Sequence, residues 1–189
     1  MTFPDADSPQ PANHQSTTSV PKLPIIWIGY VLGVATIIAE YVALSLHPEL
    51  EQQGGIPPLY LFLVSFIGGV YWLTCIHRIH VVLANVPNWK HPISPPRAVG
   101  FHFIPFYNFY WIFKWPKEIA NFVNSRLPQP TMKPIPVGVA ILAALVLRVF
   151  DPGFGLILLF IPISYVSECI RRALAAPRQR PSDDSPAST

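Results

Sequence analysis

The sequence predicts an all-α integral membrane protein: a four-helix bundle with a re-entrant or interfacial aromatic element between spans two and three. Of its 189 residues, 51% are hydrophobic. Only 12% are charged, whereas an ordinary soluble domain carries about 25% charged residues. Apolar stretches long enough to cross a bilayer alternate with Pro-rich and charged segments. The net charge of only +3 gives no reason to expect a nucleic-acid partner.

Four apolar segments are the predicted spans. The first would be about 33 Å long as a helix, enough for a hydrocarbon core of about 30 Å. The last two, of about 16 and 17 residues, are short, so they would thin the bilayer locally or be extended by flanking residues. Between them, Asp151 and Pro152 are typical of a helix N-cap followed by the first helical residue. The predicted spans are residues 25–46, 59–84, 135–150 and 154–170.

The membrane domain is predicted to cover residues 25–172. The segments outside it, residues 1–24 and 173–189, are rich in Pro and Ser and are predicted to be disordered. Orientation follows from Lys and Arg, which favour cytoplasmic loops. The loop between spans one and two has neither residue, whereas both follow span two, and Arg residues follow span four. The sequence therefore predicts a multi-pass protein of the bacterial inner membrane with both termini in the cytoplasm.

A dense aromatic run lies between spans two and three, where nine of the residues from Phe101 to Trp115 are Phe, Tyr or Trp. Basic residues flank residues 95–115 on both sides, so this element is predicted to enter and leave the membrane on the cytoplasmic side. Pro105 predicts a break, because it removes a backbone hydrogen bond and disfavours helical geometry at Ile104. The residues assigned to the element are Ser94, Pro95, Phe103, Ile104, Pro105, Phe106, Asn108, Trp111 and Trp115.

Two interpretations of residues 95–115 stay open at this point. Amphipathic aromatic rings favour the headgroup level, which makes the element an interfacial anchor. Alternatively, it packs between the spans as a plug, and Asn108 bonds the carbonyls freed at Pro105. Residues 116–127, with apolar side chains on one face, are predicted to form a short surface helix on the cytoplasmic leaflet.

Part of this element resembles a known signature. The run from Ile93 to Gly100 contains a Ser-Pro pair and a small-residue step, and it is followed by Phe103-Ile104-Pro105 and then Asn108. This pattern resembles that of a bacterial membrane domain of unknown function, which has two helices before the motif and two after it. The resemblance covers roughly residues 25–172, with its specific part at residues 94–108. It implies an architecture and adds no chemistry.

Two charged residues fall inside predicted spans and need an explanation. Glu40 and Arg148 both lie near the outer ends of their spans. A charge within the bilayer costs roughly 2.5–3.5 kcal/mol on insertion scales, so we expect Glu40 and Arg148 to form an ion pair that fixes helix packing. A proton- or ion-coupling site and snorkelling of each side chain to the surface are the alternatives.

Histidines and basic residues gather at the cytoplasmic side. His77 and His80 share a helix face and could hold a metal, but spacing fixes no third ligand, so no metal site is predicted and these two stay weak candidates. Six basic residues are candidates for binding lipid headgroups. They are Arg78, Lys90, Arg97, Lys114, Lys117 and Arg126.

The sequence contains no recognisable catalytic motif and predicts a non-enzymatic membrane protein without a cofactor. The expected role is an accessory, assembly, lipid-binding or partner-binding subunit that meets the lipid bilayer and another membrane protein or a second copy. A transporter or channel would use Glu40 and the break at Pro105. A membrane-embedded metal enzyme would need the histidines and Glu168 to converge on one cavity. If Glu40, Arg148 and Asn108 line one water-accessible cavity, a transport function is favoured over an accessory role.

Overall fold

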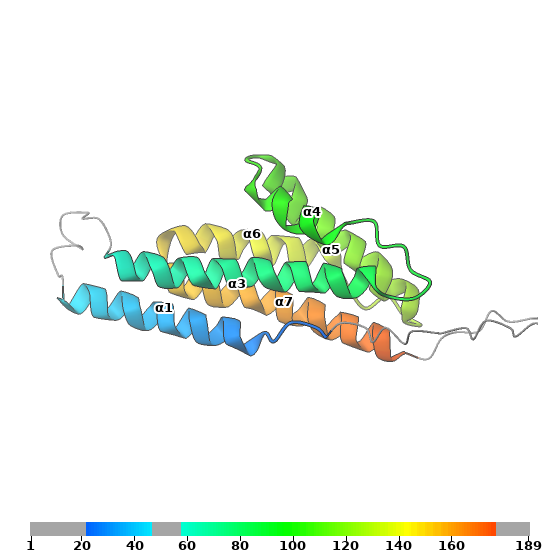
Figure 1. The fold of residues 1–189 in the computed structure, drawn as a ribbon, viewed down its shortest axis with the longest axis horizontal. Helices are drawn as coiled ribbons and strands as arrows, with labels where there is room; N and C mark the ends of the chain where they lie inside the picture. The colour runs from blue at the N-terminus through cyan, green and yellow to red at the C-terminus, as the bar shows by residue number, and fades with distance from the viewer. Residues whose placement is uncertain (1–21, 47–57, 177–189) are drawn as a thin grey trace, which may run out of the picture.

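Four antiparallel helices form the body of the protein (Figure 1). The computed structural model describes residues 22–46 and 58–176. Within these residues the fold is all-α, and α1 begins and α7 ends toward the same end of the bundle, with the last turns of α7 extending beyond the start of α1. The bundle consists of α1 (Trp27–Leu46), α3 (Leu59–Ala84), α6 (Pro134–Phe150) and α7 (Pro152–Ala175).

Three helices, α1, α3 and α7, are long and apolar enough to cross a membrane. The protein is therefore a multi-pass membrane protein with three candidate spans. The apolar helix α6 has only 17 residues, about 25 Å, so the fourth predicted span is the shortest. Helix α3 has the predicted limits, whereas α7 runs to Ala175, five residues beyond the predicted end of its span.

The helix α7 continues because its last turns still bury side chains. Cys169 and Ile170 at the predicted end of the span, and Ala173 beyond it, are all buried. The predicted disorder was wrong for residues 173–175, which belong to α7. Predictions for residues 1–21, 47–57 and 177–189, including the rest of the disorder and the charges of the loop between α1 and α3, lie outside the described residues.

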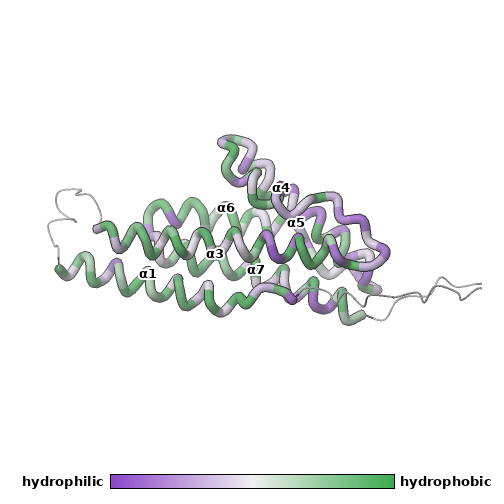
Figure 2. The backbone as a smooth tube through the Cα atoms, in the orientation of Figure 1, coloured by the Kyte–Doolittle hydropathy of each residue, from purple (hydrophilic) through white to green (hydrophobic). Residues whose placement is uncertain are grey.

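Large apolar side chains cover much of the outside of the bundle. Val31, Ile38, Phe62 and Val149 are each exposed, and many others along α1, α3 and α6 are as well. Figure 2 shows these helices as mainly hydrophobic tubes, with hydrophilic residues concentrated toward the end where α1 begins and α7 ends. A soluble protein rarely exposes so continuous an apolar surface, whereas lipid solvates it without cost.

Glycines allow α1 to approach α7 closely. A Cβ at Gly29 would collide with the ring of Phe160, and one at Gly33 would collide with Ile157. Small residues at a four-residue spacing permit such close packing of membrane helices. This GxxxG step is therefore used within the monomer.

Between α3 and α6 the chain forms what we call the aromatic hairpin, residues 95–126. It comprises α4 (Pro95–Gly100), the 3-10 turn η1 (Phe101–Phe103) and α5 (Tyr107–Arg126). The helix breaks at Pro105 as predicted, and α5 runs back toward the end from which α4 came (Figure 1). At the reversal, the Tyr107 amide donates to the Pro105 carbonyl at 2.7 Å, and Phe106 has a φ of 61°.

The helix α5 is continuous through Pro116, so the predicted boundary between an aromatic element ending at 115 and a surface helix over 116–127 is wrong. A proline within a helix loses one hydrogen bond. Here burial offsets that loss, because one face of α5 is packed along its whole length. Its buried stripe contains Trp111, Ile112, Trp115, Pro116, Ile119, Ala120, Phe122 and Val123.

Candidate functional site

The α6–α7 turn holds a carboxylate against the start of a helix. The Glu40 Oε1 accepts a hydrogen bond from the Gly153 amide at 2.8 Å. The Asp151 carboxylate accepts one from the Phe154 amide, also at 2.8 Å, which confirms the predicted N-cap. The first amides of a helix have no partner within the helix, and lipid offers none. Glu40 therefore stabilises the start of α7 from a neighbouring helix.

Arg148 has partners of its own and does not pair with Glu40. Its Nη2 donates to the Ser65 carbonyl at 2.6 Å and lies 3.2 Å from the Ser65 hydroxyl. The guanidinium lies against Gly69, where a Cβ would be 2.9 Å from both Nη atoms. The predicted ion pair is therefore wrong for the described residues. Instead, each charged side chain is hydrogen-bonded to a backbone group nearby: Glu40 to the Gly153 amide and Arg148 to the Ser65 carbonyl.

A cleft of about 310 Å³ lies between α3, α6 and the tip of the aromatic hairpin. Most of its wall is apolar, and Arg148, Asn108 and His102 are polar residues in that wall. Pockets of this composition, with a few polar groups on apolar walls, are typical of binding sites. The cleft is lined by Phe66, Gly69, Val70, Trp72, Leu73, His102, Phe103, Asn108, Leu145 and Arg148.

One carbonyl fixes the hairpin side of this cleft. The Ala98 carbonyl accepts hydrogen bonds from His102 Nδ1 at 2.9 Å and from Trp111 Nε1 at 3.0 Å. Since Nδ1 is the donor, Nε2 of a neutral His102 is an acceptor. Burial lowers the pKa of His102 to about 4, so the ring is neutral at pH 7. Its edge packs on Trp72, with 5.2 Å between the ring centroids.

Three polar atoms around the cleft are buried without a hydrogen-bond partner in the described part of the chain. They are Trp72 Nε1, His102 Nε2 and Asn108 Oδ1. The backbone amides of Tyr107 and Asn108 bond the carbonyls of Pro105 and Ile104. The prediction that the Asn108 side chain bonds these carbonyls is therefore wrong, because the turn satisfies them with its own backbone. Orphaned buried groups of this kind are rare in proteins.

The aromatic residues divide between two environments. Trp111 and Trp115 are 3% and 0% exposed and belong to the core. Phe103, Phe106 and Phe109 are 69%, 87% and 58% exposed at the tip of the hairpin. The element therefore has one face buried in the core and one exposed face. The motif alone does not reveal this division, since every position carries an aromatic ring.

The two weak metal candidates, His77 and His80, do not bond each other. His80 bonds His91, with 2.7 Å between Nδ1 and Nε2, and not His77. Burial lowers the pKa of His91 to about 4. Glu168 pairs with Arg171 and Arg172 on its own helix. Among the described residues, no group of three or more His, Cys, Asp or Glu side chains could hold a metal.

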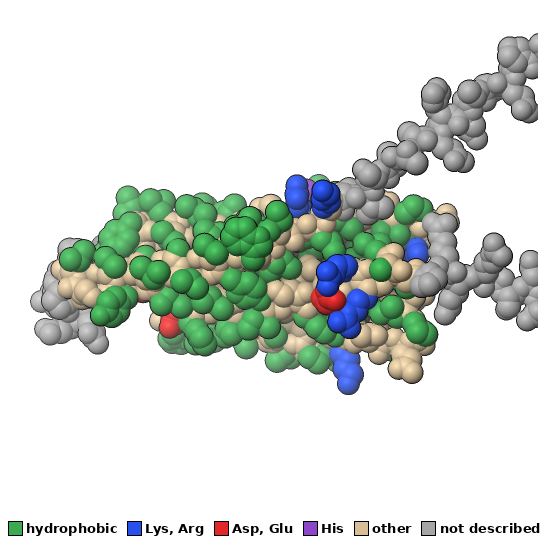
Figure 3. Space-filling view, turned by 90° about the horizontal axis from the view of Figure 1, so that it is seen from below, with side chains coloured by type: hydrophobic (Ala, Val, Ile, Leu, Met, Phe, Trp, Pro, Cys, Tyr) green, Lys and Arg blue, Asp and Glu red, His purple; other side chains and the backbone are tan. Residues whose placement is uncertain are grey.

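The six basic candidates lie in different settings. Lys114 forms an ion pair of 2.7 Å with Glu118, which raises the pKa of the lysine, and Arg126 donates to the Pro87 carbonyl at 3.3 Å. On the face in Figure 3, Lys and Arg gather toward the end where α1 begins and α7 ends. The four that are exposed are Arg78, Lys90, Arg97 and Lys117.

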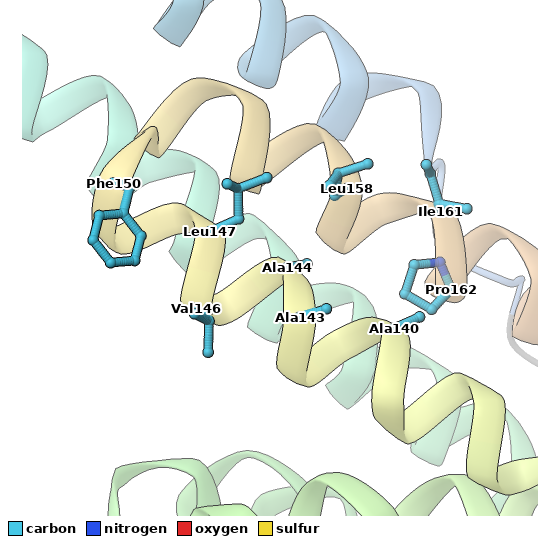
Figure 4. Close-up of a pocket in the computed structure, with 9 residues that line it drawn as sticks. All are labelled: Ala140, Ala143, Ala144, Val146, Leu147, Phe150, Leu158, Ile161 and Pro162. Carbon is cyan, nitrogen blue, oxygen red and sulfur yellow. The ribbon is translucent and has the colours of Figure 1, made fainter.

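A second hollow has no polar lining side chain. It lies between α6 and α7, where Ala140, Ala143 and Ala144 leave room beside Pro162 (Figure 4). Its volume is about 670 Å³. A groove with almost entirely apolar walls fits a lipid tail or an apolar helix and offers little chemistry for recognition.

The fold and its surfaces define a small multi-pass helical membrane protein. No protein-family model, curated protein or solved structure matches the chain. The resemblance at residues 94–108 therefore identifies no family. The structure brings Arg148 and Asn108 to one cleft, while Glu40 does not line it. Sequence reasoning missed His102 and Trp72 as cleft residues, because a histidine in an aromatic run and a tryptophan in an apolar span carry no pattern of their own.

Proposed function

We propose that the protein is a non-enzymatic subunit of the bacterial inner membrane with four spans, and that its aromatic hairpin enters the bilayer from the cytoplasmic side. In that role it meets lipid and a further membrane protein or a second copy. The observation that carries the proposal is the exposed aromatic tip of the hairpin beside the middle of α3.

The depth of the tip follows from α3. This helix has 26 residues, about 39 Å, and Trp72 lies at its midpoint. His102 packs on Trp72, so the tip is level with the centre of the helix. There Phe103 and Phe106 point their rings outward. Rings exposed at that level contact lipid tails if α3 crosses the bilayer, and lipid removes the penalty that water would impose on them.

The basic residues support the orientation. Lys90 is exposed just before the hairpin, and Arg97 and Lys117 are exposed on its two arms, α4 and α5. Lys and Arg near spans favour the cytoplasmic side. Both termini then lie in the cytoplasm, and the short helix α6 is the fourth span. Glu40, on which a transport role would rest, binds the backbone of α7, so the geometry favours an architectural role over transport.

A spin label tests the depth directly. Phe106→Cys and Lys117→Cys would be labelled separately with a nitroxide, with Cys75 and Cys169 replaced by Ala and the protein in phosphatidylcholine vesicles. Oxygen concentrates in the bilayer centre and a nickel chelate stays in water. We expect the label at 106 to collide mainly with oxygen and the label at 117 mainly with nickel. Equal nickel access at both positions would refute the inserted hairpin.

A further inference from the structure

We propose that the cleft between α3, α6 and the aromatic hairpin binds the headgroup of an anionic phospholipid whose phosphate carries a hydroxylated alcohol. Arg148 would bind the phosphate, and His102 and Asn108 would bind hydroxyl groups. The inference rests on the proposed function, because it requires the hairpin to lie in the bilayer.

The first argument is charge. Arg148 has no carboxylate within ion-pair distance among the described residues, and its Nη2 is the nitrogen that bonds Ser65. A guanidinium carries five N–H donors, so donors are left over on a side chain that lines the cleft. A cation at membrane depth needs an anion or further acceptors. A phosphate supplies both, and arginine binds it in a forked geometry.

The second argument separates a bare anion from a hydroxylated one. The unpartnered atoms His102 Nε2 and Asn108 Oδ1 are acceptors, while Trp72 Nε1 is a donor. A phosphate diester has only acceptors, so it would satisfy Arg148 and Trp72 and leave the other two unpaired. An alcohol group on the same headgroup donates to His102 and Asn108. Burial keeps the His102 ring neutral and its Nε2 free to accept.

The third argument is position. Glu40 holds the α6–α7 turn six residues before the end of α1, so α6 ends about 9 Å below the end of α1. Arg148 lies two residues before the end of α6. A short helix thins the bilayer beside it, so headgroups of the outer leaflet lie closer to the cleft there than beside α1 or α3. The apolar wall formed by Phe66, Val70 and Leu145 then receives the start of the acyl chains.

Native mass spectrometry of the detergent-purified full chain tests the site. The probes are phosphatidylglycerol, phosphatidylcholine and glycerol phosphate without tails. We expect one phosphatidylglycerol to bind at least about tenfold more tightly than phosphatidylcholine, and Arg148→Gln to weaken that binding about tenfold. The exposed residue Arg171, which pairs with Glu168 on its own helix, is the matched control, and Arg171→Gln should leave the binding unchanged.

The variants Asn108→Leu and His102→Phe keep the charge and remove the hydroxyl acceptors, which keeps the proposal testable if Arg148→Gln fails to fold. Each should narrow the preference for phosphatidylglycerol over phosphatidic acid, which has the phosphate without the alcohol. Equal binding of phosphatidylcholine, equal binding of tail-free glycerol phosphate, or no effect of the cleft variants would overturn the proposal. The spin-label test in phosphatidylcholine vesicles contains no anionic lipid, so failure of the inserted hairpin is seen separately from failure of this site.

Discussion

Two regions place irregular backbone and polar side chains among apolar helices. They differ in how many of these polar groups have a hydrogen-bond partner. At the α6–α7 turn, Glu40 and Asp151 accept from the amides of Gly153 and Phe154. At the tip of the aromatic hairpin, the backbone is satisfied, but His102 Nε2 and Asn108 Oδ1 are not.

This difference separates a structural role from a binding role. A fully bonded turn has nothing left to offer a ligand, so its charges act as fixed parts of the fold. Buried acceptors without partners are costly when the cavity is empty, and a ligand that supplies donors recovers that cost.

The largest expected effect divides the aromatic motif itself. Trp115 is fully buried and Phe109 is 58% exposed. Trp115→Ala should destabilise the protein by about 3–5 kcal/mol, because it leaves a large cavity. Phe109→Ala, whose ring packs less against protein, should change the free energy of unfolding by less than about 0.5 kcal/mol. Denaturation in mixed detergent micelles measures both. Similar losses for the two variants would show that the motif acts as one packed plug.

The next effect tests the satisfied turn. Glu40→Leu leaves the Gly153 amide without its acceptor and should cost about 2 kcal/mol, while Glu40→Gln keeps an oxygen and should cost less. Adding Arg148→Met to Glu40→Leu should sum the single effects to within about 0.5 kcal/mol, since the two side chains have separate partners. If Arg148→Met instead rescues part of the Glu40→Leu loss, an ion pair joins the two residues.

The two regions differ in how much of their structure could be predicted from the sequence. Hydropathy was sufficient for the three long apolar helices, and Asp151-Pro152 was sufficient for the start of α7, because both signals are local. The partner of Glu40 could not be read from the sequence, since it depends on the α6–α7 turn lying below the end of α1. His80 binds His91 across a loop, so the helical spacing between His77 and His80 did not identify the partner of His80. Pro116 predicted a helix boundary that does not exist, because the packing of α5 against α6 and α7 that overrides it cannot be read from local sequence.

A smaller effect concerns protonation in and near the hairpin. The pKa values of His91 and His102 are lowered from 6.5 to about 4 by burial. The folded protein thus binds fewer protons than the unfolded chain between these values, so stability is complete above about pH 6.5 and falls as the pH drops toward 4. We expect a loss of the order of 1 kcal/mol for each ring between pH 7 and 5. Unfolding of wild type and His102→Gln at both pH values measures it, and equal pH dependence in the two would contradict the assignment to His102.

The smallest effect concerns Phe106, where the contribution of the ring is compared with the strain of the backbone. The residue has φ 61° and ψ −42° in a turn closed by the bond from the Tyr107 amide to the Pro105 carbonyl. Positive φ is unfavourable for a bulky residue and costs glycine almost nothing. Yet an 87% exposed ring contributes little to packing within the protein. The strained residue therefore carries a ring that packs little against the protein. This favours lipid as the partner of the ring.

Phe106→Gly and Phe106→Ala separate the two contributions. Both remove the ring, but only glycine removes the strain, so Phe106→Gly should be about 0.5–1 kcal/mol more stable than Phe106→Ala in detergent. In vesicles, both should raise nickel access to a spin label at position 103 equally, because depth depends on the lost ring. Equal stability would mean that the turn is unstrained. Unchanged depth in both variants would mean that Phe106 does not hold the tip in the bilayer, and the hairpin would then be positioned by its buried face, through Trp111 and Trp115, alone.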